Sequence, residues 1–396
     1  MKPRALIYLK DIFVLAITSF GGPQAHIAIM HNILVKKRRY FTEEELLEVN
    51  ALCQMLPGPA STQTIIVLTQ RKWNVVMAIL ALLIWILPAC TVMTLSVILF
   101  SNFETKDIPT DFLIFVQPTA IGIIAYSGFN LATRVIRNNT GMMIMLLSLL
   151  IAASFTTPWT FLLLIVGAAI VTNFTRKEET ISTNSVKQLQ WTPSWLSFGI
   201  LIVALTTAGV LALVTKKLPF ILFENFFRFG TLTFGGGSVL VPQMFEQFVK
   251  HRHYLTANEF LSGLAISQAL PGPSFAFATF TGGMALKHWD NSFSILGCII
   301  GTIAIFLPGA LFAFFIFPIW EFVKNYFFVR RALEGINAAA VGLILSAAVI
   351  LYTNLEFHMI NIFVVIITFL LLTYTKIKAP VLIVMALGAG FIYTRI

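Results

Sequence analysis

A stretch of 40 residues that occurs twice constrains the fold of this chain more than any other feature. Phe20–Pro59 and Phe234–Pro273 align without a gap at an offset of 214 residues, and 17 of the 40 positions are identical. Each copy opens with a Phe-Gly-Gly break in an apolar run and closes on Leu-Pro-Gly-Pro. A match of this length at a fixed offset is typical of an internal repeat. The sequence therefore predicts two homologous halves.

The composition limits what these halves can be. Of the 396 residues, 58% are hydrophobic and only 11% are charged, which leaves too little polar surface for a soluble protein. Long apolar stretches recur, so we expect an all-α polytopic membrane protein that contacts the lipid bilayer. The lysines and arginines that produce the net charge of +10 form short clusters between apolar segments, as in cytoplasmic loops, so we expect no nucleic-acid partner.

We expect four regions: a first transmembrane half at 1–174, a polar linker at 175–194, a connecting transmembrane helix at 195–219 and a second half at 220–396. The candidate full crossings within these regions are 75–100, 112–133, 141–154, 158–174, 195–214, 292–318, 332–353, 358–374 and 379–394.

Loop charges predict that the halves are inverted. The loop after the first full crossing of the first half is mainly acidic, whereas its counterpart in the second half is mainly basic, and the bias reverses after the next crossing. Cytoplasmic loops are enriched in Lys and Arg, so equivalent loops face opposite sides. An inverted repeat is common among secondary transporters. The same bias places the N-terminus in the cytoplasm.

The breaks in the repeat predict helical hairpins with tips inside the membrane. An arm such as Glu43–Leu56 spans ~21 Å as a helix, less than the ~30 Å of a bilayer core. We therefore favour two re-entrant hairpins in each half, with tips at the Gly-Gly and Pro-Gly-Pro sequences. Two full crossings with broken middles are the alternative. A helix that restarts at such a tip directs its free N–H groups at the midplane, which suits an anion.

Four such tips, two from each half, could surround one small oxyanion; alternatively, the glycines and prolines only shape turns or allow close helix packing. The candidate substrate-binding residues are Gly21, Gly22, Gln24, His26, Gln54, Gly58, Ser61, Thr62, Gly235, Gly236, Gly237, Ser238, Gln243, Gln268, Gly272 and Ser274.

Two basic clusters after the first tips allow two interpretations. They either hold loops in the cytoplasm or, because inversion puts one cluster outside, form an electrostatic mouth for anions. The residues of this mouth are Lys36, Arg38, Lys250 and Arg252.

Several other features have structural interpretations. Thr42-x-x-Glu45 and Thr256-x-x-Glu259 match the capping box, which we favour over a proton-coupling carboxylate. Arg228, a charge within an apolar segment, is a functional candidate by default, although it could also reach the membrane surface. The three cysteines lack metal or disulfide spacing. No enzyme motif occurs, so we expect neither catalysis nor a cofactor or metal.

The motifs also resemble those of a known family. SFGGPQAHI and ALCQMLPGPASTQ in the first half, and FGGGSVLVPQMF and QALPGPSFAFATFTGG in the second, are similar to the paired motifs of the chromate ion transporter family. The resemblance covers most of the chain and implies a long, two-domain bacterial member in the plasma membrane. It also implies ion-gradient-driven export of chromate, a tetrahedral dianion shaped like sulfate.

Our leading hypothesis is a secondary transporter of oxyanions that exports chromate and binds it at the tips. Transport of sulfate or another oxyanion, in either direction, is the alternative of the same class. A membrane-embedded enzyme acting on a lipid phosphate is the alternative of a different class. The sequence leaves the oligomeric state open, with a homodimer as one option.

Overall fold

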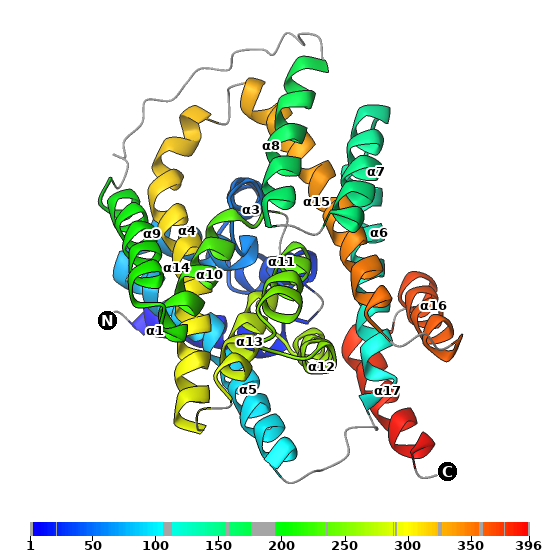
Figure 1. The fold of residues 1–396 in the computed structure, drawn as a ribbon. Helices are drawn as coiled ribbons and strands as arrows, with labels where there is room; N and C mark the ends of the chain where they lie inside the picture. Colours follow the sequence, from blue (N-terminus) through cyan, green and yellow to red (C-terminus); the bar gives the residue numbers. More distant parts are fainter. Residues whose placement is uncertain are drawn as a thin grey trace.

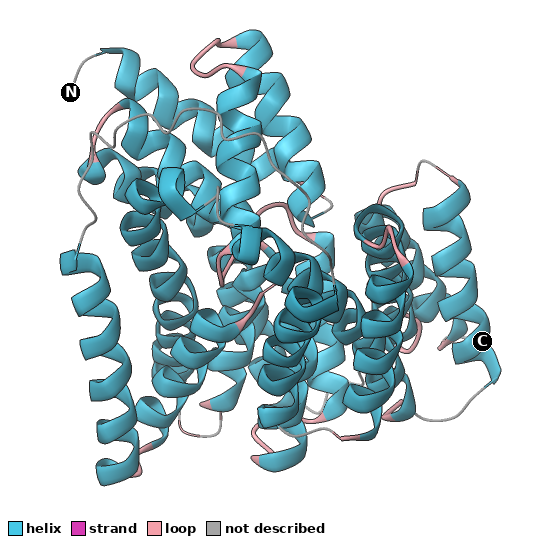
Figure 2. Cartoon of the chain, turned by 90° about the horizontal axis from the view of Figure 1, so that it is seen from above, coloured by secondary structure: helices cyan, strands magenta, loops and turns pink. Residues whose placement is uncertain are grey.

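The computed structural model describes residues 3–20, 22–105, 113–155, 158–175, 195–234, 237–287, 289, 291–323, 327–355, 359–375 and 377–394. Within these ranges all regular structure is helical (Figure 2). The first half contains α1 (Pro3–Thr18), α2 (Gly22–Met30), the π-helix η1 (His31–Lys37), α3 (Glu43–Met55), α4 (Ala60–Lys72), α5 (Val75–Thr105), α6 (Val116–Val135), α7 (Asn139–Ser154) and α8 (Pro158–Thr175).

A connecting helix, α9 (Trp195–Thr215), follows the first half, and the second half then repeats the order of the first. The elements of the second half are α10 (Leu218–Leu232), α11 (Gly237–Phe245), the π-helix η3 (Glu246–His251), α12 (Ala257–Ala269), the 3₁₀ turn η4 (Ser274–Ala276), α13 (Phe277–Ala285), α14 (Asn291–Val323), α15 (Phe327–Thr353), α16 (Met359–Tyr374) and α17 (Ala379–Tyr393).

Each crossing that the sequence predicts coincides with a helix over its described residues, although not every such helix is long and apolar enough to cross by itself. Four segments of the described chain are long and apolar enough to cross a membrane: Val75–Ser101, Trp195–Thr215, Ser292–Phe315 and Arg331–Thr353. α7, α16 and α17 are shorter apolar helices, as is Thr160–Thr175 within α8. The chain is therefore a multi-pass membrane protein. The linker predicted at 175–194 lies, beyond Thr175, outside the described residues, and the division into four regions stays a prediction.

Equivalent helices of the two halves run in opposite directions. In Figure 1, α5 runs downward and its counterpart α14 upward, while α6 runs upward and α15 downward. The packing is also reciprocal, because α6 lies against α16 and α17 of the second half, and α15 lies against α7 and α8 of the first. Such reciprocal contacts are those of a two-fold arrangement. The predicted pair of homologous, inverted halves is confirmed.

The repeated segment has the same local structure in both halves. A π-helical segment occupies equivalent positions in η1 and η3, and each is followed by a residue with positive φ, at Arg39 and His253. Both capping boxes form: the side chains of Thr42 and Thr256 accept from the third helical N–H, and Glu45 and Glu259 reach back to the cap. The capping interpretation is confirmed.

The hairpin arms are short. α1 has 16 residues, and α3 and α4 have 13 each, which gives lengths of ~24 and ~20 Å against a bilayer core of ~30 Å. These lengths support the re-entrant interpretation.

Helices of this protein expose apolar side chains on the outer surface, as expected for helices that face lipid. α9, for example, exposes Leu213 and Val214 by about three quarters, as a lipid-facing helix does.

Candidate functional site

The two Pro-Gly-Pro tips have a backbone that favours glycine. Gly58 and Gly272, which occupy equivalent positions, have φ of 109° and 106°, where a residue with a Cβ is strained. The N–H of Gly58 donates to the Thr233 carbonyl, and the N–H of Gly272 donates to the Ser19 carbonyl, each at 2.8 Å. Ser19 and Thr233 are themselves equivalent and lie directly before the Phe-Gly-Gly breaks. Each Pro-Gly-Pro tip is thus bonded to the break of the opposite half.

Contacts within each half complete a ring of four breaks. In the first half, His26 of α2 shares a hydrogen bond of 3.0 Å between its Nδ1 and the Oγ of Ser61 in α4. In the second, Gly237 lies so close to Ser274 that a Cβ on the glycine would be 2.2 Å from the serine Oγ. We call this arrangement the tip ring. The contacts join described residues at or beside the four predicted tips, and the binding of an oxyanion there stays a prediction.

The first-half part of the tip ring carries a buried polar cluster. His26, Ser61 and Thr62 are each at most 3% exposed. The indole Nε1 of Trp85 in α5 donates to Thr62 Oγ1 at 3.1 Å, and the Trp85 ring meets the His26 ring edge to face at 5.4 Å. α5 therefore fixes the orientation of both side chains that sequence analysis selected.

Gln63 joins this cluster and was missed by sequence analysis. Its Nε2 donates to the Pro57 carbonyl at 2.8 Å and to the Gly309 carbonyl of α14 at 3.1 Å, so it ties the tip to the second half. The available signal was its position in α4, two residues after Ser61, next to the tip.

Several polar groups of the first-half cluster have no hydrogen-bond partner among the described residues. They are the buried atoms Ser19 Oγ, His26 Nε2 and Gln63 Oε1. The Ser19 backbone also lies beside the His26 ring. α4 also begins without a side-chain cap at Pro59, so the N–H groups of its first turn, Ala60–Thr62, have no acceptor within the helix. Buried polar groups normally find partners, so these atoms are free to bond a ligand or water.

The equivalent positions in the second half are apolar and at most 2% exposed. The residues that correspond to His26, Ser61, Thr62 and Gln63 at the offset of 214 are Leu240, Phe275, Ala276 and Phe277. The second half has six extra residues near 283–291, so beyond them the offset is 220 and Trp85 corresponds to Ile305. The tip ring therefore has polar chemistry mainly on its first-half side.

The remaining candidate binding residues differ in their exposure to solvent, and some lie outside the described residues. Gln54 is exposed, and Gln268 is half-buried, both in the last turn of their helices. Gly22 has a positive φ of 80° at the first break. Gly21, Gly235 and Gly236 lie outside the described residues, as do the side chains of Gln24 and Ser238.

The predicted mouth residues, Lys36, Arg38, Lys250 and Arg252, are all exposed. Arg38 is engaged by Asp11 of α1, to which it donates from Nη2 at 3.0 Å and from Nε at 3.2 Å. Tyr40 donates to the same carboxylate at 2.7 Å. Lys250 lies 3.2 Å from Glu246. Arg38 and Lys250 thus also hold local structure together.

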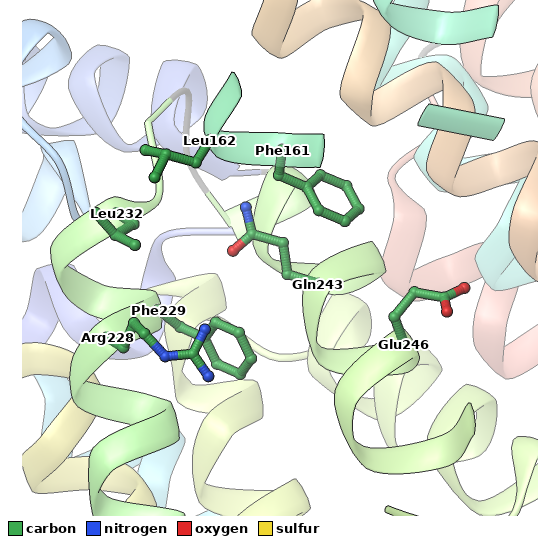
Figure 3. A pocket seen from close by; sticks show the side chains of 7 residues that line it. All are labelled: Phe161, Leu162, Arg228, Phe229, Leu232, Gln243 and Glu246. Carbon is green, nitrogen blue, oxygen red and sulfur yellow. The ribbon is translucent and has the colours of Figure 1, made fainter. Parts of the chain in front are cut away.

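A small cavity of about 20 Å³ lies beside the tip ring, between the two halves. In Figure 3, Gln243 of α11 and Arg228 of α10 reach toward the same space, while the carboxylate of Glu246 points away from Arg228. Gln243 Oε1 accepts from Thr233 Oγ1 at 3.4 Å, which connects the cavity to the tip ring. The lining residues are Phe161, Leu162, Arg228, Phe229, Leu232, Gln243 and Glu246.

Metal binding has no support within the described chain, where no group of three or more His, Cys, Asp or Glu side chains could hold an ion. The thiols of Cys53, Cys90 and Cys298 are buried and free.

Comparison with known proteins places the chain in a family. A family model described as "Chromate transporter" matches residues 7–172 and 220–392. The chromate transport protein of Cupriavidus metallidurans is 24% identical over 94% of this chain and 89% of its own length. That of Pseudomonas aeruginosa is 27% identical over 82% and 76%, and an uncharacterized transporter of Methanocaldococcus jannaschii is 24% identical over 99% and 95%. No solved structure matches. Because the family model covers both halves, the chain belongs to the chromate transporter family.

Proposed function

We propose that this protein is a secondary transporter of tetrahedral oxyanions that exports chromate across the bacterial plasma membrane and binds it at the tip ring. The observation that carries the proposal is the first-half cluster, in which three buried polar atoms without partners lie beside the uncapped start of α4. Helix N-termini at membrane depth bind anionic substrate groups in other inverted-repeat transporters. Sulfate has the same shape and charge and is the alternative substrate.

The groups around the tip ring suit a dianion that must also be released. The first-turn N–H groups of α4 and the hydroxyls of Ser19 and Ser61 can donate to an oxyanion, and the helix dipole adds favourable potential. None of the ring residues described above is a lysine or arginine, so the site offers dipoles without a full positive charge. Such a site can bind an anion without trapping it, as transport requires.

The links across the ring provide a route to alternating access. Each Pro-Gly-Pro tip is held by one backbone hydrogen bond to the opposite half, so rocking of the halves would change the two bonds together. Motion of one repeat against the other around a fixed site is the usual mechanism of inverted-repeat transporters.

Reconstitution tests this proposal. Purified protein in liposomes should move labelled chromate, with excess sulfate as competitor to rank the two anions, and should leave the lipid unchanged. Lipid turnover without anion movement would instead favour the enzyme alternative. In cells, expression should lower intracellular chromate and raise resistance, whereas higher intracellular chromate would reverse the proposed direction.

A matched pair of variants tests the site itself. His26→Leu installs the residue that the second half has at the same place, and removes the partner of Ser61 Oγ. We expect the ratio kcat/KM for chromate to fall about 10-fold or more, as for loss of one or two polar contacts. Leu240→Ile, at the equivalent apolar position, should change it less than about 2-fold. Equal effects of both variants would contradict a binding role for the first-half cluster.

Cysteine labelling tests the proposed topology, with the N-terminus in the cytoplasm. Cysteines introduced at Lys36 and Lys250, both exposed, should react with an impermeant reagent from opposite faces of the membrane. The three native cysteines are buried and should stay unlabelled. Labelling of both positions from one face would contradict the inverted insertion.

A further inference from the structure

The cavity beside the tip ring is lined by a cation, Arg228. Arg228 belongs to α10, an arm of the first hairpin of the second half, and its side chain is 29% exposed. An ionisable side chain inside a membrane segment is a candidate for a substrate path. Its equivalent in the first half is Val14, and the equivalent of Gln243 is Ile29. The polar lining of this cavity is therefore a property of the second half alone.

Two protein partners hold the guanidinium of Arg228 in place, but they use only part of its N–H donors. Its Nε donates to Glu224 at 2.8 Å, and its Nη2 donates to Asn225 at 2.8 Å. A guanidinium has five N–H donors, so these two bonds leave three that can serve a ligand. The planar, fixed arrangement of those donors suits the paired oxygens of a tetrahedral oxyanion better than a lysine does.

Gln243 faces the same cavity and connects it to the tip ring. Because its Oε1 accepts from the Thr233 hydroxyl, the NH₂ end of the amide is the end available to a cavity ligand. The Thr233 carbonyl in turn accepts from the Gly58 N–H. An anion beside Arg228 would lie next to the chain of bonds that holds a Pro-Gly-Pro tip in place. The apolar walls, Phe161 and Leu162 of α8 and Leu232 of α10, reduce screening and strengthen this interaction.

We propose that this cavity is a second, weaker anion site, at which Arg228 and Gln243 hold a tetrahedral dianion on its way to or from the tip ring. This inference rests on the proposed function. In the described conformation the cavity has room for water, and the anion displaces that water as the halves move. The site lies on one side of the ring, because the first half has no equivalent of either residue.

The test uses initial rates of labelled chromate transport in proteoliposomes that contain the full chain. Arg228→Met should raise KM about 10-fold and change the maximal rate less than about 2-fold. Arg228→Lys should give an intermediate KM. Glu224→Gln removes the carboxylate that competes with the anion for the guanidinium, so it should lower KM. Arg71→Gln removes one positive charge elsewhere and should change nothing.

The pair of variants with opposite expected signs distinguishes the proposal from a structural ion pair. If Arg228 only stabilises α10, then Arg228→Met and Glu224→Gln should both lower thermal stability, and KM should not rise in the first variant while it falls in the second. That result would overturn the proposal. An unchanged KM in Arg228→Met would also overturn it. If the unmodified protein moves no oxyanion, the proposed function itself fails, and the two failures are thereby separate.

Discussion

The two halves of this protein build the same turn and surround it with different chemistry. Gly58 and Gly272 agree in φ within a few degrees, and each donates its N–H across the ring to an equivalent carbonyl. Their surroundings differ, because His26 and Gln63 in the first half correspond to Leu240 and Phe277 in the second. The repeat therefore preserves the backbone frame, while the polar side chains concentrate in one copy.

This difference gives each half a separate part in the site. Around the second-half tip, Phe277 packs edge to face on Phe260 with centroids 4.9 Å apart and stacks on Phe280 at 6.3 Å. Such aromatic packing is dense and adds no polar side-chain atom at this position. The first-half cluster instead leaves Ser19, His26 and Gln63 with unused polar atoms. Under the proposed function, the second half supports the ring and the first half supplies the polar groups that bind the ligand.

The largest expected effect tests the shared backbone. Gly58→Ala and Gly272→Ala should each cost about 2–5 kcal/mol of stability, from strain at positive φ and from crowding, and should abolish transport. A Cβ would lie 3.1 Å from the Gly309 Cα in the first case and 3.2 Å from the Ala89 Cβ in the second. Thermal unfolding in detergent and liposome transport measure both. Gly167→Ala in α8, where a Cβ meets nothing within 4 Å, is the control and should be neutral or slightly stabilising. A large effect at only one tip would contradict the inference that the two glycines have equivalent structural roles.

The next effect tests the difference in side chains. Gln63→Leu leaves the Pro57 and Gly309 carbonyls without their donor, which should cost about 1–3 kcal/mol. Phe277→Leu, at the equivalent place, should cost less, about 1 kcal/mol, because a smaller apolar side chain replaces a larger one. Chromate transport should fall in the first variant beyond its loss of stability and should persist in the second. The same transport loss in both would mean that Gln63 acts only through packing.

The repeat allowed the fold to be predicted from the sequence, but it did not reveal that the two halves differ in the chemistry of the site. Helix bounds and capping boxes follow from local patterns, so the crossing at 75–100 and the box at Thr42 were predictable. The bond from Gly58 to Thr233 joins residues 175 positions apart, and no local pattern encodes such a contact. Identity between the copies is also no sure guide to the site. Gln54 is identical in both copies, yet its side chain in the first copy is exposed and lies outside the buried cluster. Gln63 was missed because its bond to the Gly309 carbonyl joins residues 246 positions apart, which no local pattern encodes either.

A smaller effect concerns the polar network at the end of η1. Asp11→Asn gives the first half the residue that the second half has at Asn225, and it removes the charge that Arg38 and Tyr40 share. We expect a loss of about 1 kcal/mol, as for weakening of a charge-assisted hydrogen bond between a buried carboxylate and a half-exposed arginine. Asn225→Asp is the reciprocal variant. If Arg38 serves as a mouth for anions, Asp11→Asn should also lower KM for chromate, since it releases the guanidinium.

The smallest effect compares two tyrosines in equivalent loops. Burial first, and then the hydrogen bond to Asp11, raise the pKa of Tyr40 to about 12. Burial also raises the pKa of Tyr254, but the nearby Arg252 lowers it and no carboxylate is among the causes. A folded pKa above the usual 10 means that the neutral ring stabilises the fold below pH 10 and that this contribution is lost as the pH rises toward 12. Melting temperatures should therefore fall over this range, and Tyr40→Phe should reduce the fall more than Tyr254→Phe does. Equal slopes in both variants would show that Asp11 adds nothing to the first-half loop beyond burial.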